Sequence, residues 1–251
     1  MTESSGGRAA ESSEGAGPAA GRVVVVTGAN GAAGQAVVRR LAADGAHVVA
    51  AGRHPFTWSD PRVSPAVVDL LDPAATRTWA EEVAGRFGGV DGVVHLVGGW
   101  RGGKKFADTD LDDWAFLHDQ LVRTVQHVSL AFHPYLGTAP RGRFAIVSQH
   151  AARHPRQGAA PYAAAKAAAE AWTLALADAF ADVASERAVG TGDGPAAVIF
   201  VVEALVTDAM LAERPGGDAS RFTHVDDLAE AVAGLWDEPA AEVNGRRRDL
   251  S

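Results

Sequence analysis

Hydrophobic residues from position 22 onward fall into short runs of mainly β-branched residues, separated by longer alanine-rich segments with an amphipathic pattern. Short apolar runs are typical of buried strands, and the longer segments have the spacing of helices that cover a sheet. Six runs are predicted strands: 23–27, 47–51, 64–68, 92–97, 143–148 and 196–202. Strands that alternate with helices form βαβ units and a parallel sheet. We therefore expect an α/β fold: one domain with a doubly wound parallel sheet, in three α/β/α layers.

Residues at the ends of the intervening segments favour helix starts. Asp72 followed by Pro73 predicts an N-cap and a first turn, because the Asp side chain accepts from free backbone N–H groups and proline has none to satisfy. Thr223, with Asp226 three residues later, resembles a capping box. Pro134 is expected to break or end a long helix. The predicted helices cover 35–43, 72–87, 110–136, 160–184 and 223–236.

Composition and charge narrow the class of protein. The chain has 251 residues, 47% of them hydrophobic, which fits one medium-sized domain with a substantial core. A formal charge of −8 gives no electrostatic footprint for nucleic acid or an anionic membrane, and no apolar run is long enough to span a bilayer. The basic run at 246–248 is expected to be a solvated terminus. The chain has no cysteine, which excludes disulfides and is compatible with the cytoplasm, the predicted location.

The first 21 residues differ from the rest of the chain. They consist mainly of Gly, Ala, Ser and Glu and lack the apolar segment of a secretory signal. A segment of this composition cannot bury enough apolar surface to fold. We therefore predict a disordered tail over 1–21 and a folded domain over 22–251.

Candidate chemistry centres on Tyr162 and Lys166, in a chain that contains only two tyrosines and three lysines. Positions i and i+4 share a helix face, so the Lys166 ammonium can lie beside the Tyr162 hydroxyl. A nearby cation lowers the pKa of a phenol and favours the phenolate, which suits proton transfer at neutral pH. The same pattern in an alanine-rich helix is more often an ordinary surface pair. Other motifs are therefore needed to decide whether Tyr162 and Lys166 are catalytic.

A glycine-spaced turn joins the first predicted strand to the first helix. The β-branched run leads into Gly28, Gly31 and Gly34, with Asn30 and Ala33 between them. Glycines let the backbone turn tightly and approach a pyrophosphate, and the following helix N-terminus offers free N–H groups. We predict that this turn binds a dinucleotide, although a glycine turn alone can have a purely steric origin.

With both motifs in this order, the chain resembles the short-chain dehydrogenase/reductase family. The T-G-x-x-G-x-x-G spacing that begins at Thr27 is that of its extended and atypical members, and Tyr162 and Lys166 fall where the family has its catalytic motif. The resemblance covers about 22–245. It implies a Rossmann fold, an NAD(P)(H)-dependent oxidoreductase with a small-molecule substrate, and a homodimer or homotetramer. It also implies that Tyr162 is the general acid/base, and that Lys166 binds the nicotinamide ribose and lowers the tyrosine pKa.

Arg53 follows the second predicted strand, at the end that faces the adenosine ribose in such folds. An acidic residue there would accept from the ribose 2′-hydroxyl and repel a 2′-phosphate. Gly52 occupies that place instead, and the Arg53 guanidinium is suited to a phosphate. We therefore expect NADP(H) as the cofactor, with NAD(H) as the alternative, although Arg53 could also be a solvated loop charge.

The resemblance implies further cofactor contacts in the loops after strands three, four and six. Asp69-Leu70 resembles the family's adenine-contacting pair, and Val97-Gly98 its cofactor floor. Val206-Thr207 lies where the family's loop reaches the nicotinamide and the phosphates. The usual Pro-Gly of that loop is absent here, so its geometry is in doubt.

The family's catalytic serine and asparagine do not match cleanly. Ser148 lies fourteen residues before Tyr162, where the usual separation is thirteen, and Gln149 occupies that position. Either a one-residue insertion keeps Ser148 in its role, or Gln149 polarises the substrate oxygen through its amide. The asparagine, which holds a water in the family's proton relay, is missing, and the alignment puts Leu121 or Gln120 in its place.

The predicted cofactor floor, 95–100, reads His-Leu-Val-Gly-Gly-Trp where the family commonly has Asn-Asn-Ala-Gly. It resembles the corresponding segment of dihydropteridine reductase, a likeness that is local and does not establish a pteridine substrate. Trp100 either walls the substrate pocket or fills the sheet edge. None of the histidines at 118, 127, 133, 150 and 154 sits with a carboxylate in the form of a zinc-protease site, and the His150/His154 pair lies in a loop with Arg and Pro, so we predict that the chain binds no metal. His150 is either a substrate-loop residue or simply an exposed histidine.

We therefore predict an NADP(H)-dependent oxidoreductase that moves a hydride to or from a carbonyl, alcohol or C=N centre of a small molecule. Because two members of the usual catalytic set depart from the pattern, two alternatives remain. One is a non-redox enzyme of the same fold, an isomerase, dehydratase or cyclase that uses Tyr162 as acid/base alone. The other is a non-enzymatic protein that senses NADP. Substrate specificity would be determined by three loops, 100–108, 150–161 and 205–222. Their sequences contain no motif from which the substrate can be predicted.

Overall fold

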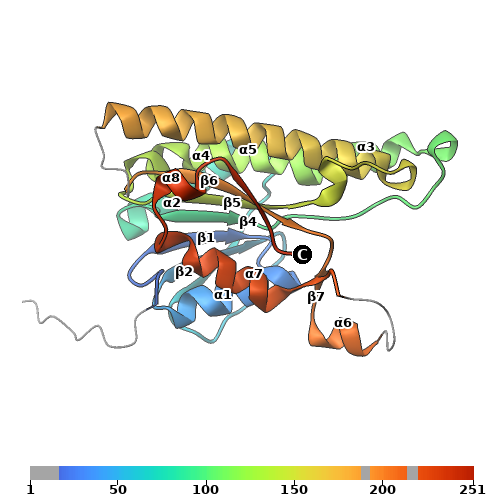
Figure 1. The fold of residues 1–251 in the computed structure, drawn as a ribbon. Helices are drawn as coiled ribbons and strands as arrows, with labels where there is room; N and C mark the ends of the chain where they lie inside the picture. The colour runs from blue at the N-terminus through green and yellow to red at the C-terminus, as the bar shows by residue number, and fades with distance from the viewer. Residues whose placement is uncertain (1–16, 188–192, 214–219) are drawn as a thin grey trace, which may run out of the picture.

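Seven parallel strands form the main sheet of the computed structural model, which describes residues 17–187, 193–213 and 220–251. The order along the sheet is β3-β2-β1-β4-β5-β6-β9 (Figure 1). The strands are β1 (Val23–Thr27), β2 (His47–Gly52), β3 (Val63–Val67), β4 (Gly92–His95), β5 (Arg143–Gln149), β6 (Ala196–Val202) and β9 (Arg246–Asp249). Two short strands, β7 (Leu205–Val206) and β8 (Thr223–His224), pair beside it. The order reverses between β1 and β4, so the predicted doubly wound α/β fold is confirmed.

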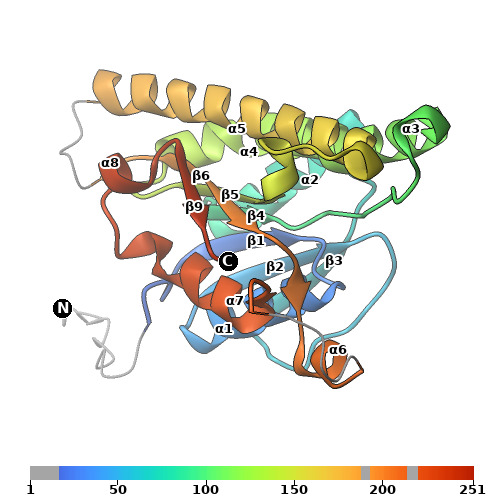
Figure 2. The ribbon, with the colours of Figure 1, turned by 45° about the vertical axis from the view of Figure 1, so that its right-hand side comes forward.

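Helices cover both faces of this sheet, which gives the three predicted layers (Figures 1 and 2). One face carries α1 (Ala32–Ala43) and α7 (Val225–Ala233), and the other carries α2 (Pro73–Phe87), α4 (Thr124–Thr138) and α5 (Ala160–Glu186). The shorter helices are α3 (Leu111–His118), α6 (Asp208–Ala212) and α8 (Ala240–Val243). Successive strand residues point to opposite faces, so Val24 and Val26 pack under α1 and α7 while Val25 packs under α4 and α5.

The C-terminal strand β9 corrects the expectation of a solvated basic terminus. Residues 246–249 pair in parallel with β6 and extend the six predicted strands to seven. Arg247 is bound by Glu170 and Arg248 by Glu238, each through two hydrogen bonds. Because carboxylates on either side of the strand neutralise these side chains, a run of charged residues can form a sheet edge.

The helix boundaries agree with the sequence at Asp72, whose side chain accepts from Ala74 and Ala75 as the predicted N-cap of α2. They differ at α7, where His224 is the N-cap and Thr223 belongs to β8. The hydroxyl of Thr223 donates to the carbonyl of Leu250, and the side chain of His224 accepts from the N–H of Asp226 in its place.

The predicted helix 110–136 is interrupted and also runs on past its expected end. A π-helical turn, Asp119–Arg123, separates α3 from α4. α4 continues through Pro134 to Thr138. Pro134 and Leu130 are both exposed, so water can satisfy the Leu130 carbonyl that loses its helical donor.

Residues 17–21, which we assigned to the tail, form a turn against the loop between α1 and β2. The backbone N–H of Gly17 donates to Asp44 and that of Gly21 to Gly45. Residues 1–16, the rest of the predicted tail, lie outside the described residues. Within the described ranges, no helix combines the length and apolarity needed to cross a membrane.

Candidate active site

The turn after β1 forms a glycine-lined cradle. Gly28 has a φ of 73°, and a Cβ there would lie 2.7 Å from the carbonyl carbon of Leu96. A Cβ on Gly34 would lie 2.3 Å from the Gly28 oxygen, so α1 packs directly on the turn. At Gly31 and Gly98 the nearest atoms would lie 3.5 and 3.9 Å away. Gly28 and Gly34 therefore shape the turn, whereas Gly31 and Gly98 leave room for a ligand beside the N-terminus of α1.

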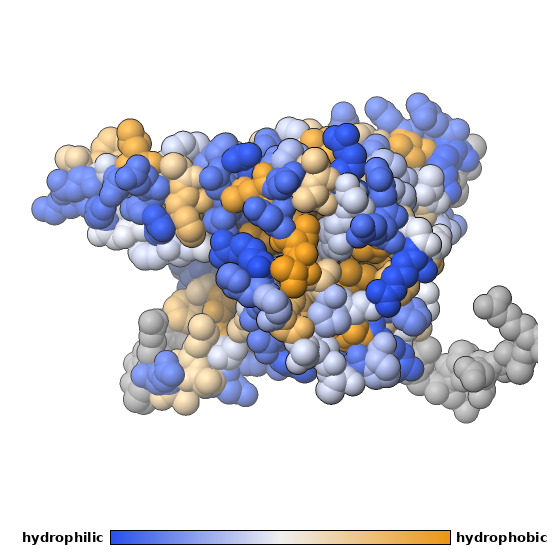
Figure 3. All heavy atoms as spheres, turned by 180° about the vertical axis from the view of Figure 1, so that it is seen from behind, coloured by the Kyte–Doolittle hydropathy of each residue, from blue (hydrophilic) through white to orange (hydrophobic). Residues whose placement is uncertain are grey.

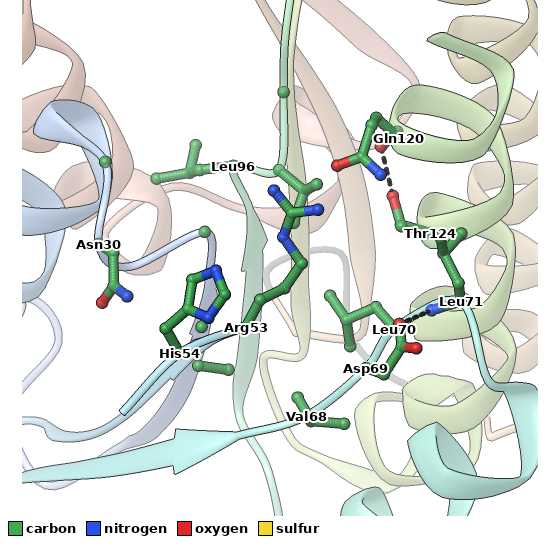
Figure 4. Close-up of a pocket in the computed structure, with 16 residues that line it drawn as sticks. Asn30, Arg53, His54, Val68, Asp69, Leu70, Leu71, Leu96, Gln120 and Thr124 are labelled. Atoms are coloured by element: carbon green, nitrogen blue, oxygen red, sulfur yellow. Dashed lines mark hydrogen bonds between the residues drawn. The ribbon is translucent and has the colours of Figure 1, made fainter. Parts of the chain in front are cut away.

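A cavity of about 320 Å³ opens at this turn, at the carboxyl ends of β1, β2 and β4 (Figure 4). Its lining includes eight residues that we predicted to contact the cofactor: Gly28, Asn30, Gly31, Arg53, Asp69, Leu70, Val97 and Gly98. The remaining predicted contacts do not line it: Ala33 and Gly34 lie in α1, Lys166 in α5, Val206 in β7, and Thr207 caps α6. The open cradle and an arginine at its rim fit the adenosine and phosphate parts of a dinucleotide.

Gln120 and Thr124 also line the cavity, and the sequence did not assign Thr124 to the site. The Thr124 hydroxyl donates to the Gln120 carbonyl at 2.6 Å, so it can only accept from Nε2 of His95, 3.1 Å away. The other ring nitrogen of His95 then accepts from Thr27 at 2.8 Å. Burial, together with the charge of Lys166, lowers the pKa of His95 to about 3, so the ring is neutral. This chain of hydrogen bonds joins β1, the cofactor floor and the π-helical turn.

The π-helical turn separates the two residues that could stand in place of the missing asparagine. Gln120 lines the cavity, and Figure 4 shows its amide directed into it. Leu121 is buried in a small apolar cluster that also includes Leu117 and Tyr162. The residue of the π-helical turn that packs with Tyr162 is therefore the apolar Leu121. We expect a proton relay that differs from the family's.

Tyr162 and Lys166 share the inner face of α5, as their spacing predicted. The Lys166 ammonium donates to the carbonyl of Val147 at 2.7 Å and lies 5.8 Å from the centre of the Tyr162 ring. Burial raises the pKa of Tyr162 to about 12, so in this structure burial outweighs the lowering that we expected from Lys166. Burial lowers the pKa of Lys166 to about 8, and the charge of Glu170 opposes this shift. Tyr162 is therefore a protonated phenol at neutral pH and can serve as a proton donor.

Ser148 and Gln149 point to opposite faces of β5. Phe144 and Ile146 pack under α5, so strand alternation places Ser148 on the same face as Tyr162. Ser148 is 1% exposed, and its hydroxyl has no hydrogen-bond partner among the described residues. The Gln149 amide is already engaged, since it donates to the Glu203 carbonyl and accepts from the N–H of Ala151. Of the two candidates, Ser148 is therefore the one whose polar group is not engaged by another described residue.

The segment between β4 and α3 forms an arm that extends beyond the end of the sheet (Figure 1). Trp100 is 62% exposed and lies over Gly102, so it does not fill the sheet edge. Phe106 and Leu111 are also exposed, and hydrophobic surface appears at the tip of the arm in Figure 3. The arm therefore presents apolar side chains at the side of the molecule where α3 and the turn before α5 meet.

The histidines form no metal site in the described part of the chain, where no three potential ligands come together. His150, which we considered a substrate-loop residue, lies 3.3 Å from the Ser251 hydroxyl and 3.4 Å from the Asp249 carboxylate. His127 bonds to the carbonyl of Leu70 at the cavity wall. These histidines hold loops together.

Residues 22–184 match the family described as short chain dehydrogenase. The chain belongs to the short-chain dehydrogenase family. This confirms the predicted class of enzyme, an NAD(P)-dependent dehydrogenase or reductase, since the family's members include the reductases described next. The matched region contains the glycine turn and the Tyr162/Lys166 pair, the two motifs on which the prediction rested.

Two relatives illustrate the range of similarity within the short-chain dehydrogenases. The chain is 26% identical to the 3-oxoacyl-[acyl-carrier-protein] reductase of Escherichia coli over 241 residues, which are 90% of this chain and 93% of that protein. It is 36% identical to an uncharacterised oxidoreductase of Mycobacterium tuberculosis over 149 residues, 58% of each chain. The first is named as a reductase and the second as an oxidoreductase.

Solved short-chain dehydrogenase structures share the fold. A short chain dehydrogenase of Burkholderia cenocepacia in complex with NADP superposes with a TM-score of 0.69 at 27% identity, covering 93% of this chain and 98% of that one. A 3-ketoacyl-(acyl-carrier-protein) reductase of Brucella melitensis complexed with NADH has a TM-score of 0.75 at 21% identity, covering 92% and 97%. One neighbour carries NADP and the other NADH, so the preference for NADP(H) stays a prediction.

Proposed function

We propose that the protein is an NADP(H)-dependent reductase of a carbonyl or C=N group in a small organic molecule, with Tyr162 as the proton donor. The observation that carries the proposal is the pair of partly buried Tyr162 and buried Lys166, on the same face of the sheet as the Ser148 hydroxyl, which has no partner among the described residues. When bound, NADPH supplies the hydride. The Tyr162 phenol supplies the proton, and its pKa, raised by burial to about 12, keeps that proton available at neutral pH.

The other residues of the site orient the substrate and keep water out. Ser148 can donate to the reacting oxygen, which develops negative charge as the hydride arrives. The Lys166 ammonium, one turn beyond Tyr162, offers two further N–H donors besides the one bound by Val147, and these suit ribose hydroxyls. Leu121 and its apolar neighbours pack against Tyr162, and this burial raises the pKa of the phenol.

The direct test follows absorbance at 340 nm while the protein is mixed with NADPH and a panel of small ketones, aldehydes and imines. We expect NADPH loss that matches product formation for at least one member of the panel. Turnover of a substrate without NADPH loss would favour the isomerase, dehydratase or cyclase alternative. NADPH binding with no turnover across the panel would favour the sensing protein.

The preference for NADP(H) is proposed to rest on Arg53. This guanidinium lines the cavity beside Asn30 and has no hydrogen bond or ion pair among the described residues, so it is available to a 2′-phosphate. Replacing Arg53 with alanine is expected to weaken NADPH binding by about 10-fold to 100-fold, because one charge-assisted bond is lost, and to leave NADH binding unchanged. Binding is measured by nicotinamide fluorescence. Arg62→Ala removes an exposed arginine outside the cavity as the control; an equal loss for NADPH and NADH would contradict the assignment.

We also propose a homodimer or homotetramer that assembles through α4 and α5. Leu130 and Leu174 are exposed on these helices, beside a shallow cavity lined by Ser129, Leu130, His133, Trp172, Ala175, Leu176 and Ala179. A second copy would cover this apolar surface. The molar mass in solution tests the proposal, since a monomer at micromolar concentration would refute it. The predicted cytoplasmic location stays a prediction.

A further inference from the structure

Arg247 of the C-terminal strand reaches α5, the helix that carries Tyr162 and Lys166. Its Nε atom lies 3.1 and 3.0 Å from the two carboxylate oxygens of Glu170. Glu170 is only 5% exposed. β9 lies at the edge of the sheet next to β6 (Figure 2). A buried carboxylate therefore joins the last strand of the sheet to α5.

Glu170 follows Lys166 by one helical turn, and the two side chains lie on the same buried face. They are not within ion-pair distance of each other. Lys166 donates instead to the carbonyl of Val147 in β5, and Glu170 is bound by Arg247. Three charged residues thus follow one another from the Tyr162 side of α5 to β9: the cation Lys166, the anion Glu170 and the cation Arg247.

We propose that Glu170 and Arg247 are positioning residues, which together hold the ammonium group of Lys166 in place beside Tyr162. Glu170 attracts the ammonium, and Arg247 keeps Glu170 from drawing it away from Val147. The inference rests on the proposed role of Tyr162 and Lys166. It gives the C-terminal strand a part in the site that its sequence, read as a solvated terminus, did not indicate.

The charges around Lys166 determine how it titrates. Burial lowers its pKa to about 8, and within the described part of the chain the charge of Glu170 opposes this shift. His95 of β4 also faces Lys166, but its own pKa of about 3 leaves it neutral. Arg153, after β5, lies 3.9 Å from Glu170 and is more than half exposed, so solvent screens its charge. Removal of the Glu170 charge must therefore favour the neutral amine at Lys166.

The test measures the titration of Lys166 directly, without a substrate. The chain has only three lysines, so trace labelling with acetic anhydride across a pH series, with peptide mass spectrometry, follows Lys166 while Lys104 and Lys105 serve as internal references. The wild-type midpoint is expected at about 8. In Glu170→Gln the midpoint should fall by about one pH unit, because a charge one helical turn away is lost. In Arg247→Gln it should rise, because the cation that neutralises the Glu170 carboxylate at 3.0 Å is lost and Glu170 then attracts the Lys166 ammonium more strongly.

A matched control lies one residue along the same strand. Arg248 binds Glu238 through two hydrogen bonds of its own, and Glu238 is remote from Lys166. Glu238→Gln therefore removes a comparable ion pair of the same strand and should leave the Lys166 midpoint unchanged. Glu170→Asp keeps the negative charge and should have the wild-type midpoint. An unchanged midpoint in Glu170→Gln, or an equal shift in Glu238→Gln, overturns the inference. If Glu170→Gln does not fold, the direction of the shift in Arg247→Gln decides.

The outcome is separable from that of the proposed function. If Tyr162→Phe abolishes NADPH oxidation while the midpoints stay unchanged, the reductase proposal stands and the role of Glu170 and Arg247 falls. If the midpoints shift as expected but Tyr162→Phe remains active, the charge coupling is real, yet it does not serve catalysis through Tyr162. In that case the inference falls together with the proposed function.

Discussion

Replacing Tyr162 with phenylalanine is expected to lower kcat for carbonyl reduction by about 10²-fold to 10⁴-fold, the range of a lost general acid. The ring keeps its place against Leu117 and Leu121, so the packing of α5 is preserved and only the hydroxyl is removed. NADPH affinity should stay within about threefold of wild type, because a dinucleotide bound in the cavity at Gly28 and Arg53 does not need the hydroxyl. The measurement combines steady-state rates at 340 nm with NADPH fluorescence titration.

Tyr135→Phe is the control for this substitution, because Tyr135 is the only other tyrosine and lies half-buried on α4. Its hydroxyl is remote from the catalytic helix face, so its rate should match that of wild type. A Tyr162→Phe variant that retained more than about a tenth of the wild-type kcat would show that the phenol is not the acid. The sensing alternative predicts that outcome.

The sequence predicted those parts of the site that depend on local backbone geometry. The glycine turn was recognisable because Gly28 and Gly34 meet requirements set within seven residues of chain, a positive φ and a close approach of α1 to the turn. Tyr162 and Lys166 were recognisable because one helical turn fixes their relation. Four loop residues that follow β2, β3 and β4 came together at the predicted edge of the sheet, since parallel strands end on the same side: Arg53, Asp69, Val97 and Gly98.

Features that depend on distant contacts were not predictable. His95 bonds to Thr27, 68 residues away, and to Thr124, 29 residues away, and nothing in the local pattern marks these partners. The basic run at 246–248 read as a solvated terminus, because Glu170 and Glu238 become its partners only after folding. The raised pKa of Tyr162 has the same origin, since burial depends on Leu121 and the rest of the fold.

The choice between Ser148 and Gln149 illustrates this limit. Counting residues back from Tyr162 favours Gln149, by one position, over Ser148. The structure assigns the two side chains to opposite faces of β5, and only the face of Ser148 is covered by α5. A one-residue difference in loop length between β5 and α5 changes the count without changing the face, so the strand alternation is the better guide.

Ser148→Ala is accordingly expected to lower kcat by about 10²-fold to 10³-fold, the effect of losing a donor to the developing oxyanion. Its thermal midpoint should hardly change, because the Ser148 hydroxyl has no partner among the described residues and its loss breaks no hydrogen bond. Gln149→Ala should behave in the opposite way. It removes the amide that joins the Glu203 carbonyl to the turn after β5, so the midpoint should fall by several degrees while kcat declines by less than about tenfold.

The two variants therefore form a crossed pair, in which each is the control for the other. Rates at saturating NADPH and thermal midpoints by calorimetry are measured on both. If Gln149→Ala lost the rate and Ser148→Ala kept it, the amide would be the donor and would have to leave Glu203 when substrate binds. That rearrangement would free the carbonyl of Glu203 next to β7, and the site would then differ from the one described here in its loop after β6 as well as in its donor.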